Sequence, residues 1–514
     1  MTTRLTESLV WAAAVCLAAG TCGAADRPQW GQALTRNMVS PEKNLPTTFT
    51  PGTVGDDGRI DPARTEGLRW TAALGSLTYA TPAVAGGKVF IGTNNGTPRD
   101  ERHQGDRGVL MCFDEKSGKF LWQLVVPKYT KVKWADWHYT GISATPTVVG
   151  DRAYVVTHAA QVLCLDVNGL ADGNAGPYTD EGAHMVRRGR KPLEPRPTDA
   201  DIVWVYDMPS EVGVFPHNAA TCSILVRGDL LYVCTSNGVD WTHKKVPNPG
   251  APSLIVLNRR TGKLVARDNA DIGPRIYHGQ WSSPAFGRAG GRDLVFFGGG
   301  DGVCYAFEPP SVGPGDAAGG RRLRTAWSFT CDPKARFTRM RAGQSPPDPN
   351  GPSVIIGMPV IHAGRVYVAA GGDPWHGKQA GALYCIDAAG KGDITASGRL
   401  WSYPDLNQSA STPAIADGLV YITSYDGRVH CLDARTGKAY WVHDTGGRIC
   451  GSPLLADGKI YIGTLRRDLW VLAAGKKAKV LARVRLSSPI HSSAVAANGT
   501  LFIASGRHLY AAEK

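Results

Sequence analysis

The sequence predicts an all-β fold, an eight-bladed β-propeller with four-stranded antiparallel blades. One pattern of short β runs and tight turns recurs about eight times along the 514 residues. Its clearest copy, residues 411–441, contains alternating β runs, glycine turns and a final aromatic run. Repeating units of about 40 residues with four strands are typical of propeller blades. The pattern predicts architecture but not chemistry, because propellers carry many unrelated functions.

The copies align on one position at the start of each unit, usually a Thr-Pro pair. The aligned residues are Pro82, Pro146, Cys222, Pro284, Pro359, Pro413, Pro453 and Ser493. Turns such as Asp417-Gly418 and Asn498-Gly499 follow, and these residue types accept the positive φ of two-residue hairpins. Eight blades is therefore our prediction, and seven is the alternative count.

The two ends of the repeat region predict how the ring closes. The eighth copy stops near Ala512, after its third strand, whereas a spare outer strand precedes the first copy at Gly67–Trp70. Pairing these two strands removes an open sheet edge. We predict that residues 67–514 form the propeller and that residues 26–66 are an N-terminal extension packed along the ring.

Residues 1–25 have the features of a signal peptide. Arg4 precedes an apolar run at Leu9–Ala19, and small residues follow at 23–25. We expect cleavage after Ala24 or Ala25 and a periplasmic or secreted protein. Acylation of Cys22, as in a lipoprotein, is the alternative. No later run of about 20 apolar residues is present, so we expect no transmembrane span.

The formal net charge of +13 is compatible with an acidic glycan, lipid or nucleic-acid partner, or with a basic exported protein that has none. Basic clusters at Arg187–Lys191 and Arg321–Arg324 lack interleaved aromatic residues, which argues against nucleic-acid binding. Binding of an anionic envelope polymer is one functional reading. We expect a monomer.

Export favours disulfides, but the cysteine positions mostly argue against them. Five cysteines share one repeat position and are predicted to be buried in separate blades: Cys112, Cys164, Cys304, Cys385 and Cys431. Cys222 and Cys234 lie at equal spacing from Gly228. A three-residue turn would place them opposite each other, whereas a two-residue turn would leave them one position out of register.

The phrase Asp433–Trp441 recurs as Asp114–Trp122 and, in part, as Asn258–Lys263. It resembles the tryptophan-docking repeat of the pyrroloquinoline-quinone-like propellers. Large flat side chains on outer strands can wedge against the next blade, so we interpret the matching tryptophans as structural. They are Trp70, Trp122, Trp204, Trp327, Trp401 and Trp441.

This resemblance implies one of two functional branches. Quinoprotein dehydrogenases use pyrroloquinoline quinone with calcium, whereas proteins similar to the outer-membrane assembly factor BamB are non-catalytic scaffolds. The dehydrogenases typically carry two adjacent cysteines, and this chain has no such pair. We therefore expect no cofactor. Pyrroloquinoline quinone with calcium enters only under the alternative, a periplasmic quinoprotein oxidoreductase.

Most long insertions are predicted to emerge on one face. In a four-stranded meander, the second-to-third loops and the blade-to-blade loops share a face, which we call the long-loop face. The insertions that map there are Asn94–Arg107, Gln123–Gly141, Asn237–Gly250, Cys331–Gly351 and Gly371–Gln379. Asn168–Ala200 and residues 309–320 are expected on the opposite face. Because sites form where rigid strands present long loops, we assign function to the long-loop face.

Three of these loops each combine Asp, Trp and His. Candidate ligand- or partner-binding residues in the loops are Trp134, Asp136, Trp137, His138, Asp240, Trp241, His243, Asp373, Trp375 and His376. Further candidates nearer the axis are His217, Asn218, His278, Trp281, Gln408 and Arg448. They are compatible with a sugar or peptide pocket, with a His/Asp metal site, or with packing that joins the loops.

No local motif supports metal or catalysis. The chain has no His-x-x-x-His or Cys-x-x-Cys ligand spacing, so we expect no metal site. It has no Gly-x-Ser-x-Gly or phosphate-loop motif, so no catalytic residue is predicted. The sequence therefore favours an exported, non-catalytic binding or scaffold propeller of BamB-like type. Its partner is expected to be a cell-envelope protein or glycan docked on the long-loop face.

Overall fold

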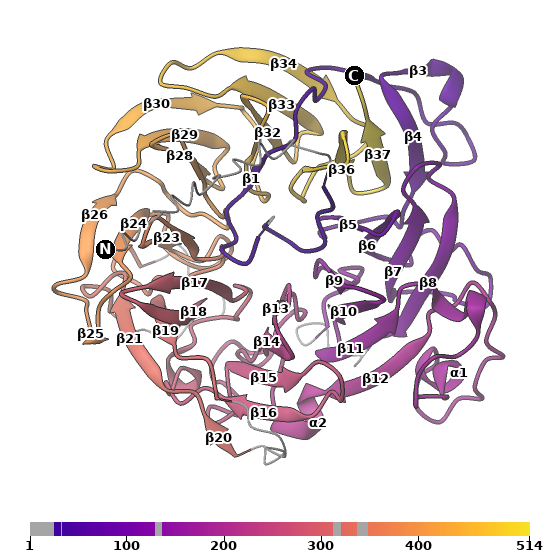
Figure 1. Ribbon diagram of the computed structural model, residues 1–514, viewed down its shortest axis with the longest axis horizontal. Coiled ribbons are helices and arrows are strands. Elements are labelled where there is room, and N and C mark those ends of the chain that lie inside the picture. Colours follow the sequence, from indigo (N-terminus) through magenta and orange to yellow (C-terminus); the bar gives the residue numbers. More distant parts are fainter. Residues whose placement is uncertain (1–24, 32, 129–135, 312–319, 337–347) are drawn as a thin grey trace, which may run out of the picture.

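A computed structural model describes residues 25–31, 33–128, 136–311, 320–336 and 348–514. Eight four-stranded antiparallel sheets surround a central axis as the blades of a propeller (Figure 1). The predicted eight-bladed fold is confirmed, and Trp134 and the predicted signal peptide up to residue 24 lie outside the described residues. Among the described residues, no helix has the length and apolar character to cross a membrane.

The strands are given from the axis outward. Blade 1 is β5 (Ala83–Ala85), β6 (Lys88–Asn94), β7 (Arg107–Asp114) and β8 (Phe120–Pro127). Blade 2 is β9 (Thr147–Val149), β10 (Arg152–Val156), β11 (Gln161–Asp166) and β12 (Ile202–Asp207). Blade 3 is β13 (Leu225–Arg227), β14 (Leu230–Cys234), β15 (Leu254–Asn258) and β16 (Leu264–Arg267). Blade 4 is β17 (Ala285–Ala289), β18 (Arg292–Gly298), β19 (Val303–Phe307) and β21 (Thr325–Thr330).

The remaining blades follow the same order. Blade 5 is β22 (Val360–His362), β23 (Arg365–Gly371), β24 (Gly381–Asp387) and β26 (Arg399–Tyr403). Blade 6 is β27 (Ala414–Ala416), β28 (Leu419–Thr423), β29 (Arg428–Asp433) and β30 (Ala439–Asp444). Blade 7 is β31 (Leu454–Ala456), β32 (Lys459–Gly463), β33 (Asp468–Ala473) and β34 (Val480–Arg485). Blade 8 is β35 (Val495–Ala497), β36 (Thr500–Ala504), β37 (His508–Ala512) and the N-terminal strand β4 (Leu68–Ala73).

Blade 8 confirms the predicted ring closure. Strand β4 pairs antiparallel with β37, and Trp70 lies opposite Ala511. The last blade therefore has no open outer edge.

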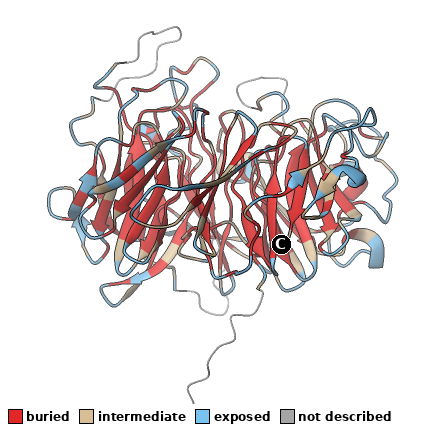
Figure 2. Ribbon diagram, turned by 90° about the horizontal axis from the view of Figure 1, so that it is seen from above, coloured by how far each residue is buried: buried red, intermediate tan, exposed pale blue. Residues whose placement is uncertain are grey.

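Burial follows the position of a strand within its blade. The second and third strands are buried on both sides by neighbouring blades, as in β14 and β19. Outer strands such as β12 alternate between buried and partly exposed residues, because only one face packs on a neighbour. Buried strand segments therefore form the middle layer of the disc, with exposed loops on both faces (Figure 2).

The six predicted docking tryptophans join successive blades. All are at least nine-tenths buried, and each indole N–H donates to a backbone carbonyl of the following blade at 2.8 to 3.2 Å. The pairing register shifts at one equivalent position in all eight blades, next to the residue opposite the tryptophan site. Such a bulge re-aims the outer strand.

The cysteine predictions are partly corrected. All nine cysteines among the described residues are free. Cys112, Cys164, Cys385 and Cys431 lie opposite docking tryptophans. The grouping of Cys304 with them is wrong, because Cys304 pairs with Phe329 and Ala306 faces Trp327.

Cys222 and Cys234 flank a two-residue turn, since Arg227 pairs with Leu230. They are consequently out of register and are not bonded. The Cys234 amide donates to the Cys222 sulfur at 3.1 Å instead.

The described part of the N-terminal segment 27–40, which leaves out residue 32, crosses the centre of the ring (Figure 1). Its residues hydrogen-bond to or beside the innermost strand of every blade. The blade residues contacted are Val84, Val148, Ser223, Phe286, Ile361, Ile415, Leu455 and Ala496. Strand β1 (Val39–Ser40) adds to β31 in parallel. The neighbouring residues Asp26, Glu42 and Leu45 bond to the first-to-second turns, so this segment covers the face opposite the long loops.

Arg36 anchors this N-terminal segment at the axis. Its side chain is fully buried and donates to three backbone carbonyls: Pro284 O at 2.9 Å, Trp30 O at 2.7 Å and Ser223 O at 2.9 Å. Ser223 and Pro284 precede the innermost strands of blades 3 and 4. The guanidinium therefore holds two blades and the segment together.

The connections mostly emerge as predicted. The five long-loop insertions follow second strands or join blades, although β8 extends to Pro127 and shortens the second of them. The prediction that the insertion at 168–200 lies on the opposite face is corrected. The insertion leaves from the opposite face but returns along blade 1 and carries helix α1 (Glu181–His184). Arg102 and Arg107 of the first long loop contact its Glu194, Asp199 and Met185.

Five further short elements lie outside the four-stranded blades. Strands β20 (Arg321–Arg322) and β25 (Gly392–Asp393) extend blades 3 and 4 in parallel. Helix α2 (Met208–Val212) follows β12, and β2 (Thr50–Pro51) pairs with β3 (Thr65–Glu66).

Candidate functional site

Four candidate histidines from separate segments meet on the long-loop face, near the axis. His217 precedes β13, and His278 precedes β17. His243 lies in the loop between β14 and β15, and His376 lies in the loop between β23 and β24. The sequence positions are distant, but the innermost ends of blades 3, 4 and 5 bring them together.

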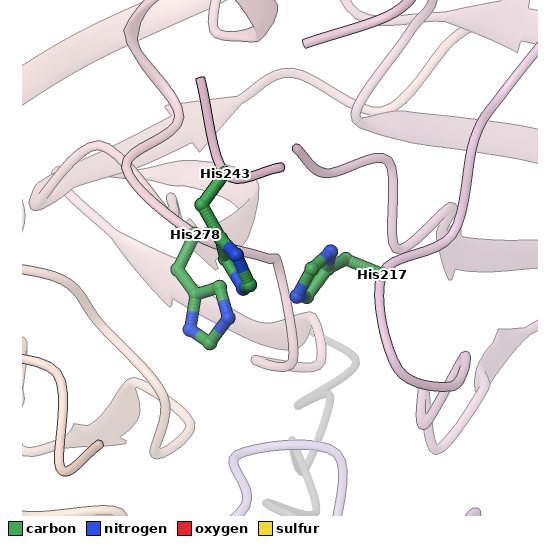
Figure 3. A group of neighbouring side chains, drawn as sticks. All are labelled: His217, His243 and His278. Carbon is green, nitrogen blue, oxygen red and sulfur yellow. The ribbon is translucent and has the colours of Figure 1, made fainter. Parts of the chain in front are cut away.

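His217, His243 and His278 form the centre of this cluster, which we call the histidine centre. One ring nitrogen of each lies within 4.8 Å of the other two. The ring centroids of His217 and His278 are 4.5 Å apart, and that of His243 lies 4.8 Å and 5.2 Å from them. The His217 ring points toward the other two (Figure 3). All three side chains belong to buried residues.

The backbone fixes the orientation of the His217 ring. Its Nδ1 lies 2.8 Å from Val239 O, which can only accept, so Nδ1 carries the proton. Nε2 of His217 is buried and has no hydrogen-bond partner among the described residues. Gly238 allows this approach, because a Cβ there would lie 2.7 Å from the His217 Cβ and 3.0 Å from the His278 carbonyl oxygen.

A buried carboxylate orients the His278 ring. Asp373 Oδ2 lies 2.9 Å from His278 Nδ1, and neither side chain is more than 2% exposed. Asp373 Oδ1 accepts the backbone N–H groups of Trp375 and His376 at 2.9 and 3.0 Å. Nε2 of His278 is buried without a hydrogen-bond partner among the described residues.

Gln408 holds the loop that carries Asp373. Its side-chain amide donates to Asp373 O at 2.8 Å and to Lys378 O at 2.9 Å. Lys378 in turn forms an ion pair with Asp332. The predicted candidate Gln408 is partly exposed and positions the Asp373 loop.

Asp240 shapes the turn that presents His243. Its Oδ1 accepts the Thr242 hydroxyl at 2.7 Å and the Lys244 amide at 3.2 Å. The His243 amide donates to Asp240 O at 2.9 Å. His243 has φ of 59°, a left-handed conformation that is unusual for a non-glycine residue and frequent at functional sites.

The surroundings of these groups keep them in the forms that can donate a lone pair. Burial, with the neighbouring His278, lowers the pKa of His217 to about 2. Burial, with His278 and His376, lowers the pKa of His243 to about 4. Burial alone would raise the pKa of Asp373, but attraction and hydrogen bonding to His278 outweigh it, so this pKa is lowered. The centre therefore contains two neutral imidazoles and an ionised carboxylate at neutral pH.

Aromatic side chains border the histidine centre. Trp281 packs edge-on against His278 at 5.1 Å and against Trp375 at 5.6 Å. Trp375 and Trp241 are 57% and 58% exposed. His376 lies 4.8 Å from His278 and 5.2 Å from His243 between ring centroids, and it is exposed on the outer side.

Other candidates lie outside this cluster. Asp136 forms an ion pair with Lys128 and lies 3.6 Å from buried His158. The Trp137 amide donates to Asn218 O at 2.6 Å and joins two loops. The guanidinium of exposed Arg448 stacks over Tyr425 at 5.5 Å. His138 is exposed, and no contact in the described part of the chain links it to the histidine centre.

A second group of potential ligands, Asp100, His103 and Asp199, has a different character. Arg102 forms ion pairs with both carboxylates at 2.5 and 2.9 Å. The positive charge that these carboxylates need is therefore already supplied by the protein. Local spacing had offered no signal for either group, because both combine residues from distant segments.

This chain is similar to several known proteins. The profile of the family described as outer membrane protein assembly factor BamB matches residues 58–309 and 379–507. The crystal structure of BamB from Moraxella catarrhalis superposes with a TM-score of 0.50 at 13% identity, over 87% of this chain and 96% of that one. The quinohemoprotein alcohol dehydrogenase of Comamonas testosteroni gives a TM-score of 0.45 at 13% identity, over 95% and 80% of the two chains.

One curated relative is a 1-butanol dehydrogenase (cytochrome c) from Thauera butanivorans. It is 31% identical over 147 residues, which are 25% of this chain and 21% of the dehydrogenase. The match thus spans about a fifth of that enzyme. The family profile, by contrast, covers most of the repeat region. This chain therefore belongs to the pyrroloquinoline-quinone-like β-propeller family that is described by the outer membrane protein assembly factor BamB.

Proposed function

We propose that this protein is an exported, non-catalytic binding or scaffold propeller of BamB-like type, which docks a cell-envelope protein or glycan on its long-loop face. The observation that carries the proposal is the pair of exposed tryptophans on the loops that also carry His243 and His376. Trp241 and Trp375 are both more than half exposed, on loops of blades 3 and 5. Exposed tryptophans are rare on free surfaces and frequent among the residues that dominate binding energy.

The remainder of the ring supports docking on this face. Residues 27–40 occupy the opposite end of the axis and bond to all eight blades. The loops of the long-loop face are tied to one another by contacts such as that of Gln408 with Lys378. A preformed surface loses little conformational entropy on binding, which favours affinity.

Site-specific photocrosslinking tests this proposal. A photoreactive amino acid at position 241 or 375 is expected to capture an envelope protein, or to retain a glycan polymer, when the protein is exposed in the native envelope. Tyr440 on strand β30 is 36% exposed at the outer rim and provides a matched aromatic control position. Equal capture at all three positions, or none at 241 and 375, would contradict docking on the long-loop face.

The second candidate is a quinoprotein oxidoreductase, which the local similarity to the Thauera dehydrogenase favours. The residues at the axis do not fit pyrroloquinoline quinone with calcium. Calcium takes oxygen ligands, whereas the atoms that converge there are imidazole nitrogens. The histidine rings also lie in mutual contact, which leaves no slot between them for a planar cofactor.

Calorimetric titration with pyrroloquinoline quinone, with and without calcium, separates the two candidates. Stoichiometric, calcium-dependent binding would establish the oxidoreductase. The scaffold proposal expects no heat of binding under either condition.

A further inference from the structure

We propose that His217, His243 and His278 bind one divalent transition-metal ion of the class that prefers imidazole nitrogen, such as Zn²⁺, Co²⁺ or Cu²⁺. This site goes beyond the docking function and does not depend on it. The argument rests on the convergence of the three nitrogens, on the hydrogen bonds of the opposite ring nitrogens, and on the nature of the donors.

The three ligand atoms already lie near the geometry that a metal needs. Their mutual distances do not exceed 4.8 Å. Imidazole nitrogens bind zinc at about 2.0–2.1 Å, which puts tetrahedral ligands ~3.4 Å apart. Small rotations of rings that start within 4.8 Å of one another would complete the site. The three residues come from two blades, so one ion would join the loop of blade 3 to the entry segments of blades 3 and 4.

Two buried ring nitrogens make the metal-free arrangement of the site energetically unfavourable. Nε2 of His217 and Nε2 of His278 are buried without a hydrogen-bond partner among the described residues. His217 is 0% exposed and the His278 side chain is 2% exposed, so bulk water does not reach these two nitrogens. A buried polar atom without a partner costs about 1–3 kcal/mol. A bound metal would use both lone pairs.

The opposite nitrogens have the partners found behind metal ligands. Metal-bound histidines usually donate their other N–H to a backbone carbonyl or a carboxylate, which sets the tautomer and the ring orientation. Here Val239 O takes that role for His217, and Asp373 takes it for His278. Asp373 also brings one negative charge close to the proposed ion. We regard it as a positioning residue.

The donor set defines the class of metal. Three imidazole nitrogens suit zinc, copper, cobalt or nickel, whereas calcium and magnesium prefer oxygen. Three protein ligands leave a fourth position open. His376 borders the three ligands, with its ring centroid 4.8 Å from that of His278.

Another buried histidine shows that burial alone does not produce this arrangement. His430 is 1% exposed, but Tyr403 Oη lies 3.2 Å from its Nδ1 and Ser424 Oγ lies 3.1 Å from its Nε2. Both of its nitrogens are satisfied by the protein. His430→Gln is therefore a matched control for histidine removal.

The test uses untagged, full-length mature protein that has been treated with a chelator. Co²⁺ is titrated while the visible d–d absorption is recorded, and Zn²⁺ is then added to compete. We expect one Co²⁺ per chain and displacement by one Zn²⁺. The variants His217→Gln, His243→Gln and His278→Gln should each bind at least about 100-fold more weakly, and Asp373→Asn about 10- to 100-fold more weakly. His430→Gln should bind as the unaltered protein does.

Two results would overturn the proposal. One is less than about 0.1 equivalent of Co²⁺ bound by the unaltered protein, which would mean that ordered water serves the two orphaned nitrogens. The other is unchanged affinity in the three histidine variants. X-ray absorption of the zinc-loaded unaltered protein keeps the test independent of variant folding. It should show three imidazole ligands, and an all-oxygen shell would refute the site.

Discussion

Replacement of Arg36 tests whether residues 27–40 are an integral part of the propeller. Arg36→Met keeps much of the side-chain volume but removes all donors from a fully buried group. The carbonyls of Trp30, Ser223 and Pro284 would then lose the partners that now lie at 2.7 to 2.9 Å. Each unsatisfied buried acceptor costs about 1–3 kcal/mol.

Part of this loss is offset, because Met removes the free-energy cost of burying the guanidinium charge. Burial lowers the pKa of Arg36 to about 10, from its usual value of 12.5. That shift corresponds to ~3 kcal/mol spent on dehydrating the charge. The group remains charged at pH 7, and Met would recover this contribution. We therefore expect the free energy of unfolding to fall by about 3 kcal/mol in Arg36→Met.

The assay is urea-induced unfolding at pH 7, followed by far-ultraviolet circular dichroism. Arg36→Lys should lie between the two proteins, because one ammonium group cannot reach three carbonyls in the geometry of the planar guanidinium. Exposed Arg435→Ala provides a control with little change. A loss below about 1 kcal/mol in Arg36→Met would refute the view that this side chain anchors the segment.

Three further perturbations probe other parts of the ring. Trp401→Ala should destabilise the protein by about 3–5 kcal/mol, because it leaves a cavity at a blade interface. Replacement of exposed Trp375 by Ala should cost under about 1 kcal/mol. Similar urea midpoints for the two variants would contradict the docking role of Trp401. Burial lowers the pKa of His430 to about 4, so below the unfolded value of 6.5 only the unfolded chain gains the proton. Stability should therefore fall by up to ~3 kcal/mol between pH 6.5 and 4, and His430→Gln should flatten this slope in unfolding curves measured across that range. Gly238→Ala would place a Cβ 2.7 Å from that of His217, so both the stability of the protein and its Co²⁺ affinity should drop. In the control Gly250→Ala, the new Cβ would have its nearest contact at 3.9 Å, so neither quantity should change.

The repeat predicted most of the fold because its signals lie within each repeating unit. Each unit carries its own alternation, its own turn residues and its own outer-strand tryptophan. The spare strand at 68–73 predicted closure for the same reason, since only its position relative to the last copy was needed. The pairing register between strands was harder to predict from the sequence. The two-residue turn at Gly228 separated Cys222 from Cys234, and Cys304 fell two positions from the place that the other four cysteines occupy.

The site was predicted as a set of residues but not as an arrangement. His217, His243 and His278 were all candidates, but they are separated by 26 and 35 positions, so no local metal-ligand spacing connects them. The signal available in the sequence was the placement of each histidine at an inner strand end or in a second-to-third loop. Gln408 was predicted as a binding residue, and its hydrogen bond to Asp373 O is a contact that the sequence did not predict.

The sequence by itself determined the number of blades, the closing strand, the docking tryptophans and the face that carries the long loops. These features depend on periodicity and on contacts between adjacent units, which the order of residues contains. The tertiary structure alone decided that residues 27–40 reach every blade, that the 168–200 insertion returns along blade 1, and that three histidines share one centre. The physical reason is that these contacts join residues distant in sequence, and their distances follow from ring closure rather than from any local pattern.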